Sequence, residues 1–378
     1  RIFQLRNTGL QNQDVLFVMD GPTDEGRVLL DPNTLSTDGT VALSRWSVSE
    51  NGRYLGYATS ASGSDWQTWH VRGVETGADL ADQIEWSKFS GASWAGDSSG
   101  FYYARYAAPE AGQDYLSVNY FQKIYFHRLG TEQAEDILIY ERPDQKEWGL
   151  DAHVSEDGDY LAIHVWQGTD VRNRFFFQKL GADAEMVELI PDLEAAYTFV
   201  GNDGPVFYLF TNLDAPKGRL IAIDTANPAR ANWRTLIPEG EDALEQVSLI
   251  HNEFVALTLH HAHHRLIRYG LAGQPLGEIG LPGLGSIPAN GDTLNLTGQR
   301  SGKELFYGFW SFLHPVSLYR FDFQTGQSEL IFAPDLPFDT SDYETRQLFA
   351  LSPDGTQVPI FLTHRRGMAM DGQNPTLL

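Results

Sequence analysis

The sequence predicts an all-β fold, a seven-bladed β-propeller in which the first blade is incomplete. Three observations support this prediction. A polar turn followed by an aromatic and β-branched run recurs along the chain, and successive turns are spaced by roughly 44 to 58 residues, the range of four-stranded blades. No long segment has apolar residues at the i, i+3, i+4, i+7 spacing of an amphipathic helix, which argues against a parallel βαβ architecture.

The repeats follow one another as far as about residue 335. Each turn contains Gly, Asp or Asn, which suit tight turns, and each leads into a run typical of a half-buried strand. In chain order, the turns and the runs that follow them are 7–9 and 15–18, 51–52 and 54–59, 97–100 and 101–103, 157–158 and 160–164, 203–204 and 206–210, Asn252 and 254–257, and Gly302 and 305–307. A single blade cannot cover its own apolar faces, so radial stacking of blades is expected.

An eighth turn and run, 353–356 followed by 358–362, have different flanks. Pro334 and Pro337 precede them, and a second segment rich in Gly, Asn and Pro follows at 371–375. Periodicity alone leaves an eighth blade open, but these flanks favour a new hairpin after a domain boundary. The chain starts inside a strand-like run and ends on the apolar pair Leu377 and Leu378, so we expect both ends to continue in a longer polypeptide.

Composition excludes several classes of function. The chain contains no cysteine, which rules out disulfides, thiol catalysis and cysteine-ligated metals. Its formal net charge of −23 and the lack of a basic cluster argue against binding to nucleic acid. No run of about 18 apolar residues is present, so we expect no membrane association. We expect no cofactor and a monomer, with a cytoplasmic location and a periplasmic one kept open.

Several stretches resemble the prolyl oligopeptidase family of serine peptidases, close to its prolyl endopeptidase branch. They occur in order along nearly the whole chain: 7–13, 31–33, 38–43, 60–66, 129–131, 135–138, 311–313 with Pro315, 341–343, and 354–356 with Pro359. The resemblance implies a propeller gating domain over residues 1–335 and, over 336–378, the opening strands of an α/β-hydrolase (peptidase) domain. It also implies short proline-containing peptides as substrates. The Ser, Asp and His of the catalytic triad would lie outside this sequence, so this chain alone is expected to be inactive.

The resemblance further implies roles for five residues. Asp65 would lie at the interface with the hydrolase domain, facing the loop that carries the catalytic histidine. Phe89 would line the substrate pocket, as would Trp166 and Thr169, which stand where some members have arginine and cysteine. Gly149 stands where some members have methionine. Each residue also has a purely structural interpretation, a turn carboxylate for Asp65 and packing between blades for the aromatic rings.

Two motifs suggest chemistry without the resemblance. Ser98 lies in a G-x-S-x-G sequence at 96–100, the pattern of a nucleophile elbow, which needs a strand, a turn and then a helix. An aromatic strand is predicted after it, so we interpret Ser98 as a turn residue. His261 and His263 share one face of a strand and could bind a metal. The preferred interpretation of the four histidines in 260–264 is an exposed hairpin end.

The sequence leaves two alternative functions open. The chain could be a stand-alone propeller that binds a protein partner at its rim, since fold does not determine function. The apolar runs within 336–378 would then be left partly unpaired, which favours the peptidase hypothesis. Within the family, specificity for basic residues instead of proline is the second alternative, because the specificity pocket lies mainly in the hydrolase domain.

Overall fold

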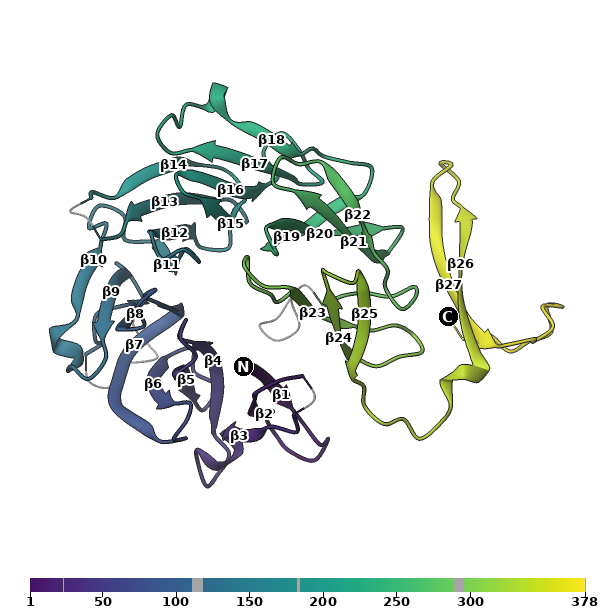
Figure 1. Ribbon diagram of the computed structural model, residues 1–378, viewed down its shortest axis with the longest axis horizontal. Coiled ribbons are helices and arrows are strands. Elements are labelled where there is room, and N and C mark those ends of the chain that lie inside the picture. Colours follow the sequence, from purple (N-terminus) through teal and green to yellow (C-terminus); the bar gives the residue numbers. More distant parts are fainter. Residues whose placement is uncertain (23, 111–117, 182–183, 289–295, 378) are drawn as a thin grey trace. The chain divides into compact units, whose positions relative to one another are not determined.

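The computed structural model describes residues 1–22, 24–110, 118–181, 184–288 and 296–377. Regular structure in this part of the chain consists of β-strands and four short 3-10 helices: η1 (Pro32–Thr34), η2 (Gln133–Glu135), η3 (Arg230–Asn232) and η4 (Thr340–Asp342). The strands pair antiparallel with their neighbours in sequence (Figure 1). The all-β prediction is therefore confirmed. Among the described residues, no helix has the length and apolar character needed to cross a membrane.

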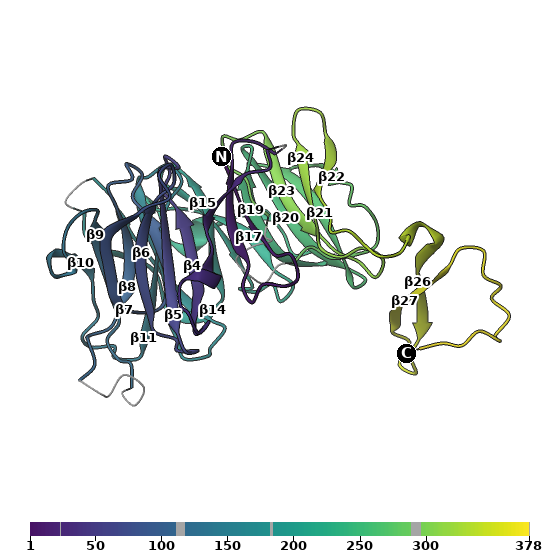
Figure 2. The same ribbon diagram turned by 90° about the horizontal axis from the view of Figure 1, so that it is seen from below.

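Within the described ranges, the strands form seven sheets. A three-stranded sheet contains β1 (Ile2–Arg6), β2 (Val15–Met19) and β3 (Arg27–Leu30). A seven-stranded sheet, seen with its strands side by side in Figure 2, contains β4 (Val41–Val48), β5 (Tyr54–Ala61), β6 (Gln67–Gly73), β7 (Asp79–Trp94), β8 (Gly100–Arg105), β9 (Lys123–Arg128) and β10 (Ile137–Tyr140).

Three four-stranded sheets follow in the chain. They contain β11 (Trp148–Val154), β12 (Tyr160–Gln167), β13 (Asn173–Lys179) and β14 (Val187–Ala195); β15 (Tyr197–Asp203), β16 (Val206–Thr211), β17 (Arg219–Asp224) and β18 (Arg234–Ile237); and β19 (Ala243–Ile250), β20 (Glu253–His260), β21 (His263–Gly270) and β22 (Pro275–Ile279). The last two sheets contain β23 (Glu304–Phe309), β24 (Ser317–Asp322) and β25 (Gln327–Phe332), and the hairpin of β26 (Tyr343–Leu351) and β27 (Gln357–Arg365).

The seven-stranded sheet consists of two four-stranded groups that share β7. The first half of this 16-residue strand pairs with β6, as far as Gln67 opposite Ser87. The second half pairs with β8, where Trp94 lies opposite Phe101. Between Ser87 and Ala92 the register with β8 shifts, so a bulge separates the two halves. Bulges bend a strand and increase its twist, which allows one strand to serve both groups.

Two of the predicted turns connect the first and second strands of a sheet or strand group, β4 to β5 and β11 to β12. In the turn at 49–54, Tyr54 N donates to Ser49 Oγ and Gly52 N donates to the Ser49 carbonyl. Ser155 makes the same two contacts with Tyr160 and Gly158 in the turn at 155–160. The glycines at these two turns have φ of 65° and 76°, which non-glycine residues rarely adopt. The sequence predictions for these turns are confirmed.

The apolar cores lie between the faces of consecutive sheets. One core joins Leu16 and Leu30 of the first sheet to Leu55 on β5 and to Val74, which directly follows β6. Another joins Phe175 and Phe177 of the β11–β14 sheet to Phe207 of the next sheet, with Phe177 and Phe207 ring centroids 4.9 Å apart. In these two pairs, one sheet covers an apolar face of the next, as the blade hypothesis requires.

The chain forms two compact units. The first contains Arg1–Asp214 and Ile221–Arg234, and the second contains Ala215–Leu220 and Thr235–Leu378. Within the second unit, the hairpin of β26 and β27 contacts the β20–β21 turn through His261 and Phe349, whose ring centroids are 5.1 Å apart. Leu351 on this hairpin is 74% exposed. The eighth turn and run thus form a hairpin, while the domain boundary after residue 335 stays a prediction.

Candidate functional site

Three of the five residues singled out from the sequence lie together in the first unit. Gly149 on β11 pairs with Trp166 on β12, and the Phe89 and Trp166 ring centroids are 6.1 Å apart with an interplanar angle of 84°. This edge-to-face geometry is favourable for aromatic pairs. We call Phe89, Gly149 and Trp166 the aromatic wall.

Gly149 leaves room for the Trp166 indole. A Cβ atom at position 149 would lie 1.9 Å from Trp166 Cε2 and 2.0 Å from Cζ2, far inside van der Waals contact. The indole therefore packs directly over the Gly149 backbone, and any side chain at this position would have to displace it. The two residues form a matched pair, which sequence spacing alone did not reveal.

Replacing Gly149 with alanine is expected to lower the free energy of unfolding by about 1–3 kcal/mol, the usual cost of overpacking. Urea unfolding measures the change. Gly283→Ala is the matched control, because a Cβ atom there meets nothing within 4 Å. In a Trp166→Ala background the cost of Gly149→Ala should largely disappear. An equal cost in both backgrounds would contradict the matched-pair interpretation.

The β7 bulge presents Phe89 to solvent. Phe89 has φ of 56° and is 45% exposed. A positive φ is unusual for an aromatic residue and marks local strain that the surrounding structure must hold. Trp86, just before the bulge, also has a positive φ, 63°. The hydrogen bonds that hold this bulge are therefore important for the position of the Phe89 ring.

Lys88 connects the aromatic wall to Asp65. Its Nζ lies 4.9 Å from the Trp66 ring centroid and 5.4 Å from that of Phe89, within cation–π range. The same Nζ lies 3.7 Å from Asp65 Oδ2. The Asp65 side chain is 62% exposed, so the ion pair contributes little to the free energy of unfolding. Its carboxylate remains available to a further cation.

Thr169 lies outside the aromatic wall. It lies in the exposed turn after β12, next to Gly168, which has φ of 57°. The residue as a whole is exposed to solvent. The structure therefore brings together Phe89, Gly149 and Trp166, and leaves Thr169 on the adjoining turn.

The two motifs that suggested other chemistry are turns. Ser98 has φ of 58° and lies between β7 and β8, where its amide donates to the Ala95 carbonyl at 2.7 Å. A strand follows it, so it is no nucleophile elbow. The histidine cluster spans the turn between β20 and β21. The predicted hairpin end is confirmed, but its exposure is not general, because His261 is exposed whereas His264 is buried on β21. His260 Nδ1 lies 2.8 Å from Asp242 Oδ1 and His264 Nε2 lies 3.0 Å from Glu245 Oε2. The described residues contain no group of three or more ligands arranged to hold a metal.

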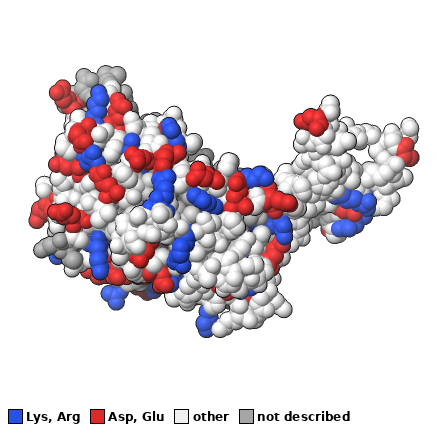
Figure 3. All heavy atoms as spheres, turned by 90° about the horizontal axis from the view of Figure 1, so that it is seen from above, with Lys and Arg blue, Asp and Glu red and all other residues white. Residues whose placement is uncertain are grey.

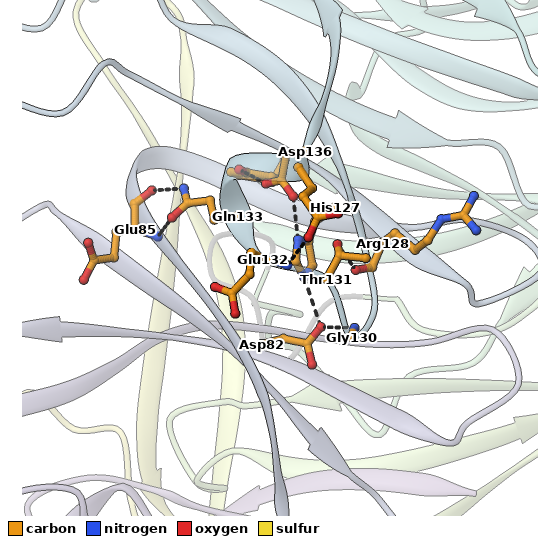
Figure 4. Close-up of polar contacts among 11 residues, drawn as sticks. Asp82, Glu85, His127, Arg128, Gly130, Thr131, Glu132, Gln133 and Asp136 are labelled. Carbon is orange, nitrogen blue, oxygen red and sulfur yellow. Dashed lines mark hydrogen bonds and ion pairs between the residues drawn. The ribbon is translucent and has the colours of Figure 1, made fainter.

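A buried polar centre in the seven-stranded sheet was missed by the sequence analysis (Figure 4). His127 on β9 is fully buried, with Nδ1 2.6 Å from Asp136 Oδ1 and Nε2 3.0 Å from Asp82 Oδ1. Asp82 also accepts a hydrogen bond from Gly130 N at 2.6 Å, and the Tyr103 hydroxyl donates to Asp136 Oδ2 at 2.5 Å. Asp82 lies 45 residues before His127, so no local motif signals their contact.

The His127 centre favours the imidazolium ion. Burial lowers the pKa of His127, but the hydrogen bonds and charges of Asp136 and Asp82 outweigh it and raise the pKa to about 9. Burial raises the pKa of Asp82, and the bonds from His127 and Gly130 outweigh this and hold it below its usual value. Because both ring nitrogens face carboxylates inside the protein, the centre stabilises the sheet and is closed to a substrate.

The surface on the face drawn in Figure 3 mixes acidic and basic side chains. Several arginines are engaged by carboxylates: Arg142 with Glu188 at 2.6 Å and Arg268 with Glu253 at 2.7 Å. A nucleic-acid phosphate backbone binds best to basic groups that no carboxylate neutralises. These paired arginines are therefore poor phosphate-binding groups. The expectation of no nucleic-acid partner stays a prediction.

The family model described as "Prolyl oligopeptidase, N-terminal beta-propeller domain" matches residues 1–334. The chain belongs to the prolyl oligopeptidase family. It is 32% identical over 373 residues to a prolyl endopeptidase of Elizabethkingia meningoseptica, covering 99% of this chain and 52% of that protein. This membership confirms the resemblance and identifies the repeated sheets as those of the family's propeller domain.

Solved structures agree with this assignment. A structure from a study of two prolyl endopeptidases matches 97% of this chain and 52% of its own, with a TM-score of 0.86 and 34% identity. Prolyl oligopeptidase B from Galerina marginata, bound to a 35mer hydrolysis and macrocyclization substrate, matches 98% of this chain and 54% of its own, with a TM-score of 0.85 and 28% identity. The chain spans about half the length of the relatives it matches.

Proposed function

We propose that this chain is the gating propeller of a prolyl-specific serine peptidase. The observation that carries the proposal is the family match over 1–334 in a chain that spans about half of its relatives. In this account a peptidase domain of the same polypeptide supplies the catalytic Ser, Asp and His. That serine gives its proton to the histidine and attacks the carbonyl carbon of the proline residue. The peptide bond to the next residue breaks, the histidine passes the proton to the leaving amine, and an acyl-enzyme remains.

The proposed propeller has seven blades over residues 1–335. The β1–β3 sheet is the first, incomplete blade, and the two halves of β7 belong to the second and third. The sheets that begin at β11, β15, β19 and β23 are the remaining four. In the last of them, the bridge of Thr297 to Phe306 supplies a further pairing beside β23. Residues 336–378, with the β26–β27 hairpin, are proposed to be the opening strands of the hydrolase domain.

The proposed role of the propeller is to limit access, without any chemistry of its own. Opening and closing of the two domains would admit short peptides and exclude folded proteins. Closure would also exclude water, which strengthens the electrostatic interactions at the catalytic centre. Asp65, with its exposed carboxylate, is the proposed contact to the peptidase domain.

The aromatic wall is the proposed surface for substrate side chains upstream of proline. Phe89 and Trp166 present apolar rings, and Gly149 allows the Trp166 indole to lie flat. Such a surface favours apolar or aromatic side chains, because Trp166 presents an aromatic ring where some members of the family have arginine. Thr169, on the adjoining turn, would contact the same part of the peptide.

Hydrolysis assays test the proposal directly. The full-length polypeptide encoded by the source gene is expected to cleave a proline-containing peptide after proline and to lose this activity on treatment with a serine-reactive fluorophosphonate. The polypeptide of residues 1–378 is expected to show no hydrolysis after repurification. Failure of the full-length protein to cleave would contradict the proposed function, and activity of the 378-residue chain would contradict the placement of the triad outside it.

A further inference from the structure

The β7 bulge separates Phe89 from the ordinary hydrogen-bond ladder. Ser87 pairs with Arg105 and Ala92 pairs with Tyr103 on β8, so four residues of β7 face only one residue between the two pairs. Backbone groups within a bulge lose their ladder partners, and a buried group without a partner is costly. The bulge therefore needs hydrogen-bond partners other than the paired residues of β8.

Gln122 supplies one of these partners. It immediately precedes β9 and is 2% exposed. Its Nε2 donates to the Lys88 carbonyl at 2.8 Å, and its Oε1 accepts from Leu150 N at 2.7 Å. The first bond holds the residue before Phe89, and the second holds the residue after Gly149. One buried amide thus bridges the two backbone segments that carry the aromatic wall.

The strand beside the bulge is suited to this bridge. β11 is an edge strand of its sheet, and alternate N–H groups of an edge strand point away from the neighbouring strand. Leu150 N is bonded by Gln122, and Val154 N donates to Ser93 Oγ on β7 at 2.8 Å. Asp151 Oδ1 accepts from Gly91 N at 3.1 Å. Side-chain bonds therefore connect β7 directly to β11, and Gln122 adds a bridge that bonds the bulge at Lys88 and β11 at Leu150.

We propose that Gln122 is a positioning residue that fixes the Phe89 bulge against the Gly149 strand and thereby sets the spacing of the aromatic wall. This inference rests on the proposed function, because the wall is taken as the surface for substrate side chains upstream of proline. Gln122 acts through Phe89 and Gly149 and does not itself need to contact substrate. The residue was not among those singled out from the sequence.

The test uses the full-length polypeptide and two variants. Gln122→Met keeps a similar side-chain length and removes both bonds, whereas Gln122→Glu keeps the acceptor for Leu150 N and removes the donor to Lys88. Gln178→Met is the matched control, because Gln178 Nε2 also donates to a backbone carbonyl, that of Ala184 at 2.7 Å, away from the bulge. Far-UV circular dichroism checks that every variant is folded.

Two readouts separate positioning from a general structural effect. In Gln122→Met, kcat/KM is expected to fall about tenfold, mainly through KM, for a peptide with an aromatic side chain upstream of proline. For a minimal peptide with only glycine before proline, it should change less than about twofold. Gln122→Glu should show the same selective loss, whereas Gln178→Met should leave kcat/KM for both peptides unchanged. Amide hydrogen exchange at Leu150 should become at least about tenfold faster in Gln122→Met but not in Gln122→Glu.

Equal losses on the two peptides in Gln122→Met, or unchanged exchange at Leu150, would overturn the proposal. If the wild-type polypeptide cleaves neither peptide, the proposed peptidase function is wrong. The exchange measurement then decides alone whether Gln122 holds the two segments together, so the two failures are distinguishable.

Discussion

Replacing His127 with alanine is expected to lower the free energy of unfolding by about 3–5 kcal/mol. The reason is that two buried carboxylates, Asp82 and Asp136, would lose the cation between them. Breaking a buried ionic pair by removing one partner costs more than the pair contributes, because an uncompensated charge is left inside the protein. Urea or thermal unfolding followed by circular dichroism measures the loss.

The control for this variant is His314→Ala, because His314 is exposed. It should change stability by less than about 0.5 kcal/mol, as surface substitutions usually do. His127→Gln should lie between the wild type and the alanine variant, because a glutamine amide can still donate to one carboxylate. A His127→Ala protein as stable as the His314→Ala protein would show that the buried centre does not stabilise the sheet.

Stability is also expected to fall as the pH rises through about 9. The pKa of His127 in the folded protein is raised from 6.5 to about 9 by Asp136 and Asp82, against the effect of burial. A raised pKa means that the folded state holds the proton more tightly than the unfolded state. The contribution of protonated His127 to the free energy of unfolding is therefore complete below about pH 6.5 and is lost as the pH rises through about 9. The difference in pKa corresponds to about 3 kcal/mol.

Unfolding curves at pH 6 and pH 9.5 test this expectation. The wild type should lose stability between these values, and His127→Gln should lose clearly less. Measurements stay below pH 10 because burial also raises the pKa of Tyr57 and of Tyr106 to about 12, and these groups add their own alkaline effects. A wild type and a His127→Gln variant with the same pH dependence would contradict the assignment of the proton to His127.

The repeated sheets could be predicted from sequence because their signals are local. The turns at 49–54 and 155–160 use a serine, an Asn or Asp, and a glycine at the same offsets, and their hydrogen bonds lie within six consecutive residues. Strand-forming runs after each turn are equally local. Ser98 could be interpreted correctly for the same reason, since the residues after it already indicate a strand.

Features that depend on distant residues could not be predicted in this way. Asp82 and His127 are 45 residues apart, so nothing local in the sequence indicates that they meet. The long strand β7 and its bulge also escaped the sequence analysis, because Gln122 and Asp151, which hold the bulge, lie on other segments. The contact of Phe89 with Trp166 depends on this bulge.

The candidate site residues could be predicted only from the resemblance to known peptidases, because the repeat pattern of turns and strands does not indicate a binding surface. Phe89, Gly149 and Trp166 were selected by family position, and only the structure relates them through the β11–β12 pairing and the Trp166 indole. Thr169 was selected in the same way and lies on the exposed turn. The residue types alone give no reason to group an aromatic ring at position 89 with a glycine at position 149.

The intact mass of the native protein in its source tests the central claim most directly. An antibody raised against residues 1–378 would identify the polypeptide, and its mass would be read by mass spectrometry. The account predicts a single chain larger than this one by roughly 30–40 kDa, the size of one substantial further domain with an N-terminal segment. A native mass equal to the 42.3 kDa of this chain would contradict it and point to a propeller that acts through partners bound at its rim.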